Sequence, residues 1–208
     1  MQRKPESDNP FERISDYYQS LVDRYGHDPR ACDYGRPESQ EAKFRVIATA
    51  VHGGTRSVLD VGCGFADFAG FLDSRFPAIE YVGIDISDAM VKKAQELHPD
   101  KKIILGNFAE TGFDRQFDLV TANGIFYLLG EQAETHMQRL IAKMFSLCSD
   151  AAVFNSLSAW APDRESGEFY ADPAATLDYC RTLTPWVALR HDYHPRDFTV
   201  FLFKKQVR

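Results

Sequence analysis

Residues 57–68 read SVLDVGCGFADF, and this stretch decides the fold. Val58, Leu59 and Val61 form a short apolar run rich in β-branched side chains, which is typical of a buried strand. Glycines at 62 and 64 end the run, and apolar side chains then recur at helical spacing: Phe65, Phe68, Phe71 and Leu72. The stretch therefore predicts a strand, a tight glycine turn and a helix. Because glycine lacks a side chain and a helix N-terminus follows, a ligand can lie directly on the backbone of this turn.

A second motif is the apolar run YVGID at residues 81–85, which ends in a carboxylate. Asp85 follows Gly62 by a little more than 20 positions, the offset at which a βαβ unit brings an acidic side chain to a ribose hydroxyl pair. A dinucleotide site of the form G-x-G-x-x-G would need glycine at position 67. Asp67 stands there instead, and its charge would repel a pyrophosphate, so the sequence disfavours an NAD site.

Three motifs in order, VLDVGCG at 58–64, GIDIS at 83–87 and FDLVTANGIFYLL at 117–129, resemble the class I S-adenosylmethionine-dependent methyltransferases. The resemblance in pattern runs from about Val58 to the C-terminus. It implies an α/β, Rossmann-like three-layer sandwich with a mostly parallel seven-stranded sheet, a C-terminal antiparallel hairpin and an N-terminal helical lid. It also implies S-adenosyl-L-methionine as cofactor and methyl transfer as the reaction.

The resemblance assigns cofactor contacts to the first two motifs. Asp60, Gly62, Cys63 and Gly64 fall in the glycine motif, and many family members have a further glycine where this chain has Ala66. The methyl group of Ala66 is expected to tighten the turn without blocking it. Asp85 would hold the ribose hydroxyls, and the adenine would pack against two side chains that follow it, Ile86 and Met90.

Other cofactor contacts are expected further along the chain. Asn107 and Phe108 follow the third strand, where they would meet the adenine. Asn123 is either a turn former, because Asn-Gly is a strong turn signal, or an acceptor for the cofactor's amino group. Tyr34 or Arg36 would bind the carboxylate of the methionine part, for which the guanidinium fork of arginine is suited, although an arginine in a solvated loop is an equal alternative.

Aromatic side chains are the candidates for the methyl acceptor. Tyr18 lies on an amphipathic helix expected from about Phe11 to Tyr25, and Phe126 and Tyr127 are either core residues or pocket walls. Trp160 belongs to an unusually long loop after the fifth strand. Catalytic residues stay unassigned, because no sequence context singles out one general base among five candidates: Tyr127, Asp163, Glu168, His191 and His194.

Composition limits the remaining possibilities. The 208 residues predict a single domain. The resemblance implies that it is a methyltransferase domain, with residues 1–52 as the lid segment and 53–208 as the core. The net charge of −6 gives no general attraction to nucleic acid, and no apolar run reaches membrane-spanning length. The polar start lacks the apolar segment of a signal peptide, so a cytoplasmic location is expected. Four scattered cysteines predict reduced thiols and no metal site.

The leading hypothesis is methyl transfer to a small-molecule acceptor. Methylation of a protein or RNA group and a non-catalytic cofactor-binding protein are the alternatives, and a nicotinamide oxidoreductase is more distant. The strands are expected at 58–61, 81–85, 102–105, 117–122, 151–157, 186–193 and 198–204. The acceptor, the atom methylated and the oligomeric state are left open.

Overall fold

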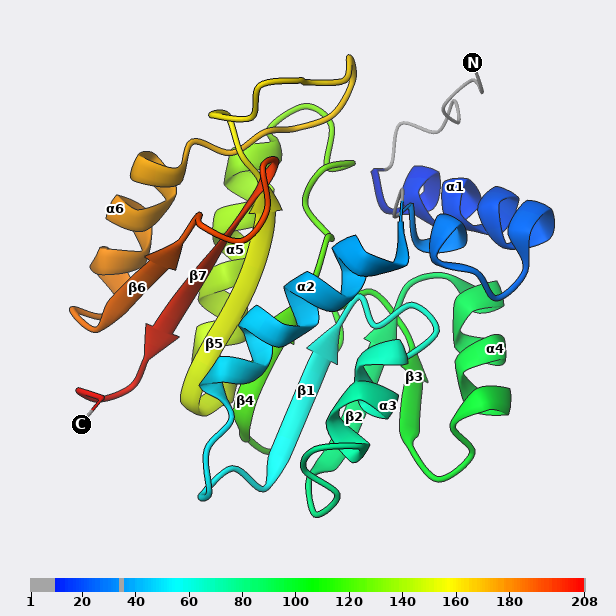
Figure 1. The fold of residues 1–208 in the computed structure, drawn as a ribbon, viewed down its shortest axis with the longest axis horizontal. Coiled ribbons are helices and arrows are strands. Elements are labelled where there is room, and N and C mark those ends of the chain that lie inside the picture. Colours follow the sequence, from blue (N-terminus) through cyan, green and yellow to red (C-terminus); the bar gives the residue numbers. More distant parts are fainter. Residues whose placement is uncertain (1–9, 34–35, 208) are drawn as a thin grey trace.

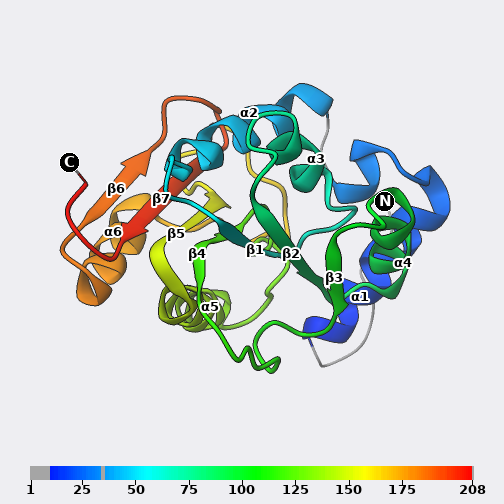
Figure 2. The same ribbon diagram turned by 90° about the horizontal axis from the view of Figure 1, so that it is seen from below.

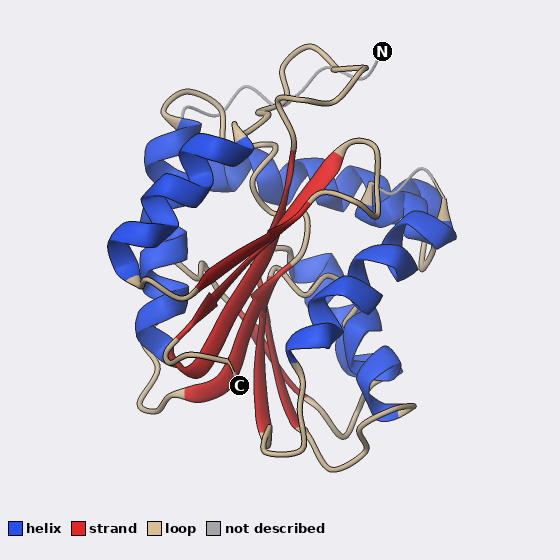
Figure 3. Cartoon of the chain, turned by 60° about the vertical axis from the view of Figure 1, so that its left-hand side comes forward, coloured by secondary structure: helices blue, strands red, loops and turns tan. Residues whose placement is uncertain are grey.

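The computed structural model describes residues 10–33 and 36–207, which form a seven-stranded sheet between two layers of helices (Figures 1 and 3). The strand order is β3-β2-β1-β4-β5-β7-β6. Neighbours from β3 to β5 are parallel, and β7 is antiparallel to both β5 and β6. The strands are β1 (Ser57–Val61), β2 (Glu80–Asp85), β3 (Lys102–Leu105), β4 (Phe117–Ala122), β5 (Cys148–Leu157), β6 (Val187–Arg190) and β7 (Asp197–Phe203). This architecture confirms the predicted fold class.

Alternation along the strands builds the two apolar layers. In β1, Val58 packs toward one face, whereas Leu59 and Val61 pack toward the other, as a period of two requires. One face is covered by helices α2 (Pro37–Ile47), α3 (Asp67–Asp73) and α4 (Asp88–Leu97). The other is covered by α5 (Ala133–Leu147) and α6 (Pro173–Leu183) (Figure 2). Parallel strands buried on both faces explain why the central strands read as continuous apolar runs.

The N-terminal segment has two different positions in the fold. Helix α1 (Pro10–Tyr25) and the 3₁₀ turn η1 (Pro29–Cys32) lie beside α4, where Leu21 and Ala31 pack on Phe65 and Met90. Helix α2, in contrast, lies on the sheet, where Phe44 contacts Phe68 with ring centroids 5.1 Å apart. A short 3₁₀ turn, η2 (Ala48–Ala50), then leads to β1. Of the described elements in this segment, α1 and η1 pack beside α4, whereas α2 packs on the face of the sheet.

Two strands differ from the expected bounds by more than one residue. β5 begins at Cys148, three residues before the expected Ala151. β6 covers only Val187–Arg190, because residues 191–196 leave the sheet and form the turn to β7. Pro195 lies in this turn, and it has no N–H to donate to a ladder. All four cysteines are free thiols, and among the described residues no helix is both long and apolar enough to cross a bilayer.

Ala66 provides a prediction about the glycine turn. It precedes α3 with φ 59° and ψ 31°, a left-handed conformation in which an L side chain is unfavourable by roughly 1–2 kcal/mol. Ala66→Gly removes this strain and also about 0.8 kcal/mol of methyl burial. We therefore expect urea unfolding to show a stability that is unchanged or up to about 1 kcal/mol higher.

Ala69 is the matched control, because it is equally buried but lies inside α3. Ala69→Gly should lower the unfolding free energy by about 1–2 kcal/mol, since glycine is unfavourable within a helix. Equal losses in the two variants would contradict the assignment of strain to position 66.

Candidate active site

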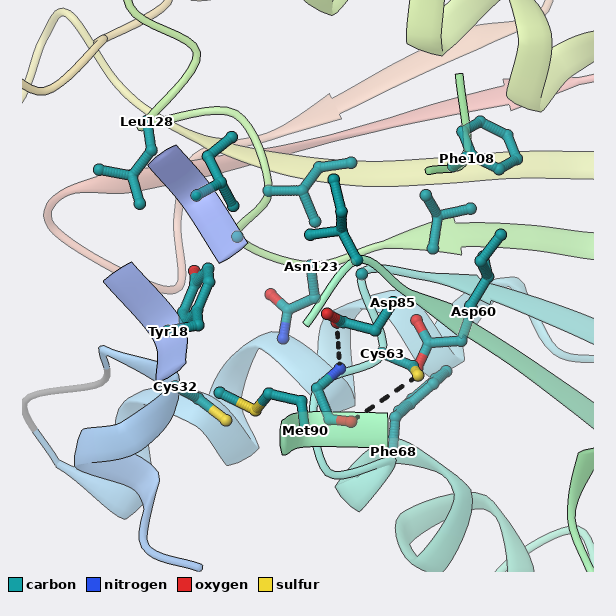
Figure 4. A pocket seen from close by; sticks show the side chains of 18 of the residues that line it. Tyr18, Cys32, Asp60, Cys63, Phe68, Asp85, Met90, Phe108, Asn123 and Leu128 are labelled. Atoms are coloured by element: carbon teal, nitrogen blue, oxygen red, sulfur yellow. Dashed lines mark hydrogen bonds between the residues drawn. The ribbon is translucent and has the colours of Figure 1, made fainter. Parts of the chain in front are cut away.

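A cavity of about 130 Å³ lies at the carboxyl ends of β1, β2 and β4, under α1 (Figure 4). β1 is the point in the sheet from which the chain order runs in both directions, and open α/β sheets bind ligands at such positions. The glycine turn after β1 and the carboxylate at the end of β2 both line this cavity.

The glycine turn requires the absence of a side chain. Gly62 has φ +69°, and a Cβ atom there would lie 2.3 Å from Ile125 Cγ2. The N–H groups of Gly62 and Cys63 both donate to the Ile84 carbonyl oxygen, at 2.8 and 3.2 Å. Gly64 also has a positive φ, of +54°. The turn is therefore fixed against β2 and presents bare backbone to the cavity.

Asp85 connects the two motifs directly. Its Oδ2 accepts a hydrogen bond from the Gly64 N–H at 2.8 Å (Figure 4). Its Oδ1 accepts one from the Ser87 N–H at 2.9 Å. Burial raises the pKa of this carboxyl group, while these backbone donors lower it. A carboxylate has about four acceptor sites, so its oxygens retain capacity for ligand hydroxyl groups.

Asp60 is the second buried carboxyl group of the cavity. The Tyr81 hydroxyl donates to its Oδ2 at 2.6 Å, from the neighbouring strand. Burial raises the pKa of Asp60 to about 7, and the negative charge of Asp85 adds to this effect. The protonation of this group therefore changes near neutral pH.

The raised pKa of Asp60 predicts how stability depends on pH. An unfolded aspartate titrates near 4, so between about pH 4 and 7 the folded protein holds a proton that the unfolded chain has lost. Stability therefore falls as pH rises through this range, by at most about 1.4 kcal/mol per pH unit. Asp60→Asn keeps an oxygen for Tyr81 and cannot ionise. In urea unfolding from pH 5 to 8, we expect the variant to gain stability relative to the wild type as pH rises; a constant difference would contradict this.

Asn155 on β5 positions the loop after β4, and sequence reasoning did not identify it. Its Nδ2 donates to Asn123 Oδ1, and its Oδ1 accepts from the Gly124 N–H at 2.7 Å. Asn155 is fully buried, so both bonds form away from water. The side chain of Asn123 is thereby fixed at the cavity wall (Figure 4). In the sequence, the position of Asn155 within a mostly apolar strand is the indication that could have pointed to this role.

Tyrosine hydroxyls connect the lid to the loop after β4. The hydroxyls of Tyr18 and Tyr127 lie 3.0 Å apart, and Tyr127 donates to Asp33 Oδ2 at 2.8 Å. Tyr17 donates to the same oxygen at 2.7 Å. Burial is the main cause that raises the pKa of all three tyrosines, so they stay neutral at ordinary pH. Of the two adjacent tyrosines, Tyr17 is hydrogen-bonded to Asp33, whereas Tyr18 lines the cavity.

The structure brings most of the predicted site residues to one place. The following line the cavity: Tyr18, Asp60, Gly62, Cys63, Gly64, Asp85, Ile86, Met90, Asn107, Phe108, Asn123 and Tyr127. The amide oxygen of Asn107 accepts the Ala109 N–H at 3.0 Å, so it already has one partner. Phe108 is buried in the core beneath the rim.

Three predicted residues do not line this cavity, and a fourth, Tyr34, is outside the described residues. Arg36 is exposed at the N-terminus of α2 and does not line the cavity. Phe126 is buried edge-to-face against Phe154, and Trp160 is 56% exposed and stacks on His191. Cavity residues that the motifs did not identify come mainly from α1, η1 and α2: Phe11, Ile14, Cys32 and Gln40.

The sequence is similar to those of known methyltransferases. A family profile described as a methyltransferase domain matches residues 58–149. Rv1506c of Mycobacterium tuberculosis, which is named as a methyltransferase, is 30% identical over 155 residues, covering 71% of this chain and 93% of that protein. The trans-aconitate 2-methyltransferase of Rhodopseudomonas palustris is 31% identical over 87 residues, 42% of this chain, and the match spans only 34% of that enzyme.

The fold is similar to that of a solved enzyme. The magnesium protoporphyrin IX methyltransferase of Synechocystis, determined with bound S-adenosylmethionine, superposes with a TM-score of 0.70 over 97% of this chain and 100% of that one. The two sequences are 16% identical, so this similarity describes the fold alone.

Proposed function

Because this chain belongs to the class I S-adenosylmethionine-dependent methyltransferases, we propose that it transfers the cofactor's methyl group to a small-molecule acceptor. The observation that carries this proposal is the cavity shared by the glycine turn and Asp85, which are joined by a hydrogen bond.

The residues of this cavity fit the cofactor. Gly62 must lack a side chain, because a Cβ atom there would collide with Ile125, and Gly64 adds a second stretch of bare backbone to the cavity wall. We propose that Asp85 accepts the ribose hydroxyls with its remaining acceptor sites. Ile86 and Met90 offer apolar contacts for the base, and Asn123 offers a polar contact near the methionine part. Asp60, which precedes the glycine turn, also lines the cavity, and its carboxylate would favour a cationic ligand there.

The bound cofactor would supply an electrophilic methyl group on a sulfonium, and the protein contributes mainly orientation and exclusion of water. Orienting two reactants can account for roughly 7–11 kcal/mol of barrier lowering. Here the glycine turn fixes one side of the cavity, and α1 covers it with Tyr18 hydrogen-bonded to Tyr127. A small acceptor suits a cavity enclosed in this way. The acidic net charge of −6 also gives no attraction for RNA.

Two measurements test this proposal. Isothermal titration with S-adenosylhomocysteine should show one site per chain. Incubation with methyl-labelled S-adenosylmethionine and separate pools of metabolites and macromolecules should then place the label in the small-molecule fraction. Label found only in protein or RNA would overturn the small-molecule acceptor while leaving the family assignment intact.

A further inference from the structure

A second cavity, of about 150 Å³, adjoins the first and is lined mostly by polar groups. The two cavities share three wall residues: Cys32, Gly124 and Tyr127. The second cavity lies between η1, α2, the ends of β4 and β5, and the turn before β7. A molecule bound there would be next to whatever occupies the first cavity.

A row of polar side chains lines this second cavity. Ser39 Oγ on α2 lies 3.0 Å from His194 Nε2. His194 Nδ1 lies 2.7 Å from Asp197 Oδ2 and 3.2 Å from the Arg196 backbone nitrogen. Asp197 is 2% exposed, and its Oδ1 is held by Lys43 Nζ at 3.0 Å. Lys43 and His194 both lower the pKa of Asp197, so it is ionised at neutral pH. An imidazole with a fixed carboxylate behind it can accept a proton, because the carboxylate stabilises the imidazolium that forms.

The charge around this cavity selects the kind of molecule it can hold. Among the described lining residues, four carboxylates face two permanent cations: Asp33, Glu165, Glu168 and Asp197 against Lys43 and Arg196. Both cations already form ion pairs within the protein: Lys43 pairs with Asp197, and Arg196 pairs with Glu165 and Glu168. Burial raises the pKa of Glu168, and the negative charges of Glu165 and Asp33 add to this effect. An anionic acceptor would be repelled here, and a cationic one would be attracted.

We propose that the second cavity binds the methyl acceptor as an amine, and that His194 is the base that accepts its proton. This inference rests on the proposed function above. An amine is protonated at neutral pH and must lose a proton before it can attack, whereas a carboxylate acceptor is already ionised and needs no base. A base and an excess of carboxylates in one cavity therefore point to the same class of acceptor.

The reaction balances as follows. The ammonium of the acceptor gives one proton to His194 Nε2, beside the Ser39 hydroxyl. The nitrogen lone pair then forms the N–C bond, while the C–S bond breaks and its electron pair stays on sulfur. The products are the methylated ammonium and S-adenosylhomocysteine, and His194 returns its proton to solvent.

The test uses the full chain, methyl-labelled S-adenosylmethionine and a panel of probes. Ethanolamine, benzylamine and spermidine represent amines, and trans-aconitate and citrate represent carboxylates. We expect label in at least one amine and in neither carboxylate. His194→Gln should lower kcat by about 10²–10⁴-fold, the range for loss of a general base. His98→Gln, at the end of α4 and outside both cavities, is the matched control and should keep the wild-type kcat.

Two further readouts separate chemistry from structure. The dissociation constant of S-adenosylhomocysteine should be the same in wild type and His194→Gln, because the first cavity does not contain His194. Added imidazole should restore part of kcat in His194→Gly, which a structural role would not allow. Methylation of carboxylates alone, of no probe despite normal S-adenosylhomocysteine binding, or unchanged kcat in His194→Gln would overturn the inference. Absent S-adenosylhomocysteine binding would instead contradict the proposed cofactor site.

Discussion

Lys43→Met is expected to lower the free energy of unfolding by about 3–5 kcal/mol, the usual effect of removing one partner from a buried ion pair. The Lys43 and Asp197 side chains are only 8% and 3% exposed, and their charged atoms lie 3.0 Å apart. Methionine fills similar space but leaves the carboxylate of Asp197 buried beside the His194 imidazole, without its lysine partner. Because this pair joins α2 to β7, its loss should loosen the wall of the second cavity. Urea unfolding at neutral pH measures the effect.

Lys92→Met is the matched control for this substitution. Lys92 pairs with Asp88 at the surface of α4, where the two side chains are 70% and 52% exposed, so its loss should change stability by less than about 1 kcal/mol. The pH dependence adds a second check. The pKa of Asp197 is lowered in the fold, so the stability it contributes is present above its unfolded pKa and is lost as pH falls through the folded pKa. The difference between wild type and Lys43→Met should therefore shrink in acid, and equal losses in both variants would contradict the account.

Asp85→Asn is expected to weaken binding of S-adenosylhomocysteine by about 10–100-fold. Hydrogen bonds to a charged group contribute roughly 1.5–3 kcal/mol, and each 1.4 kcal/mol corresponds to a factor of ten in affinity. The amide also places an NH₂ group against the backbone N–H of either Gly64 or Ser87, both of which now donate to the carboxylate. Isothermal titration measures the affinity.

Asp88→Asn makes the same substitution three residues later, on the exposed first turn of α4 outside the cavity. Its dissociation constant should match that of the wild type. Thermal melts of both variants show whether they are folded. An Asp85→Asn protein that is folded and binds normally would exclude Asp85 from the binding site.

Local sequence was sufficient for the parts of the fold that depend on neighbouring residues. The β-branched run before Gly62 and the helical spacing after it predicted β1 and α3, because strand and helix periods are local properties. The acidic end of β2 was found by its offset from the glycines, since a parallel βαβ unit returns the chain to the same edge of the sheet.

Local sequence patterns could not predict the contacts between residues that lie far apart in the chain. Ser39 and His194 are hydrogen-bonded although they lie 155 positions apart, and neither has a local pattern that predicts the other. Asn155 orients Asn123 from a different strand, and Asp33 meets Tyr127 only because α1 and η1 pack over the cavity at the strand ends. The long loop after the fifth strand predicts Trp160 as an acceptor contact, but its ring packs on His191, a contact that composition does not reveal.

The central claim is that the backbone of residues 62–64 and the carboxylate of Asp85 form one nucleoside-binding cavity. A crystal structure with S-adenosylhomocysteine tests it most directly. The account predicts the adenosine between the glycine turn and Asp85, with the ribose hydroxyls donating to that carboxylate and the sulfur facing the second cavity. Adenosine bound elsewhere, with Asp85 still hydrogen-bonded only to Gly64 and Ser87, would contradict it.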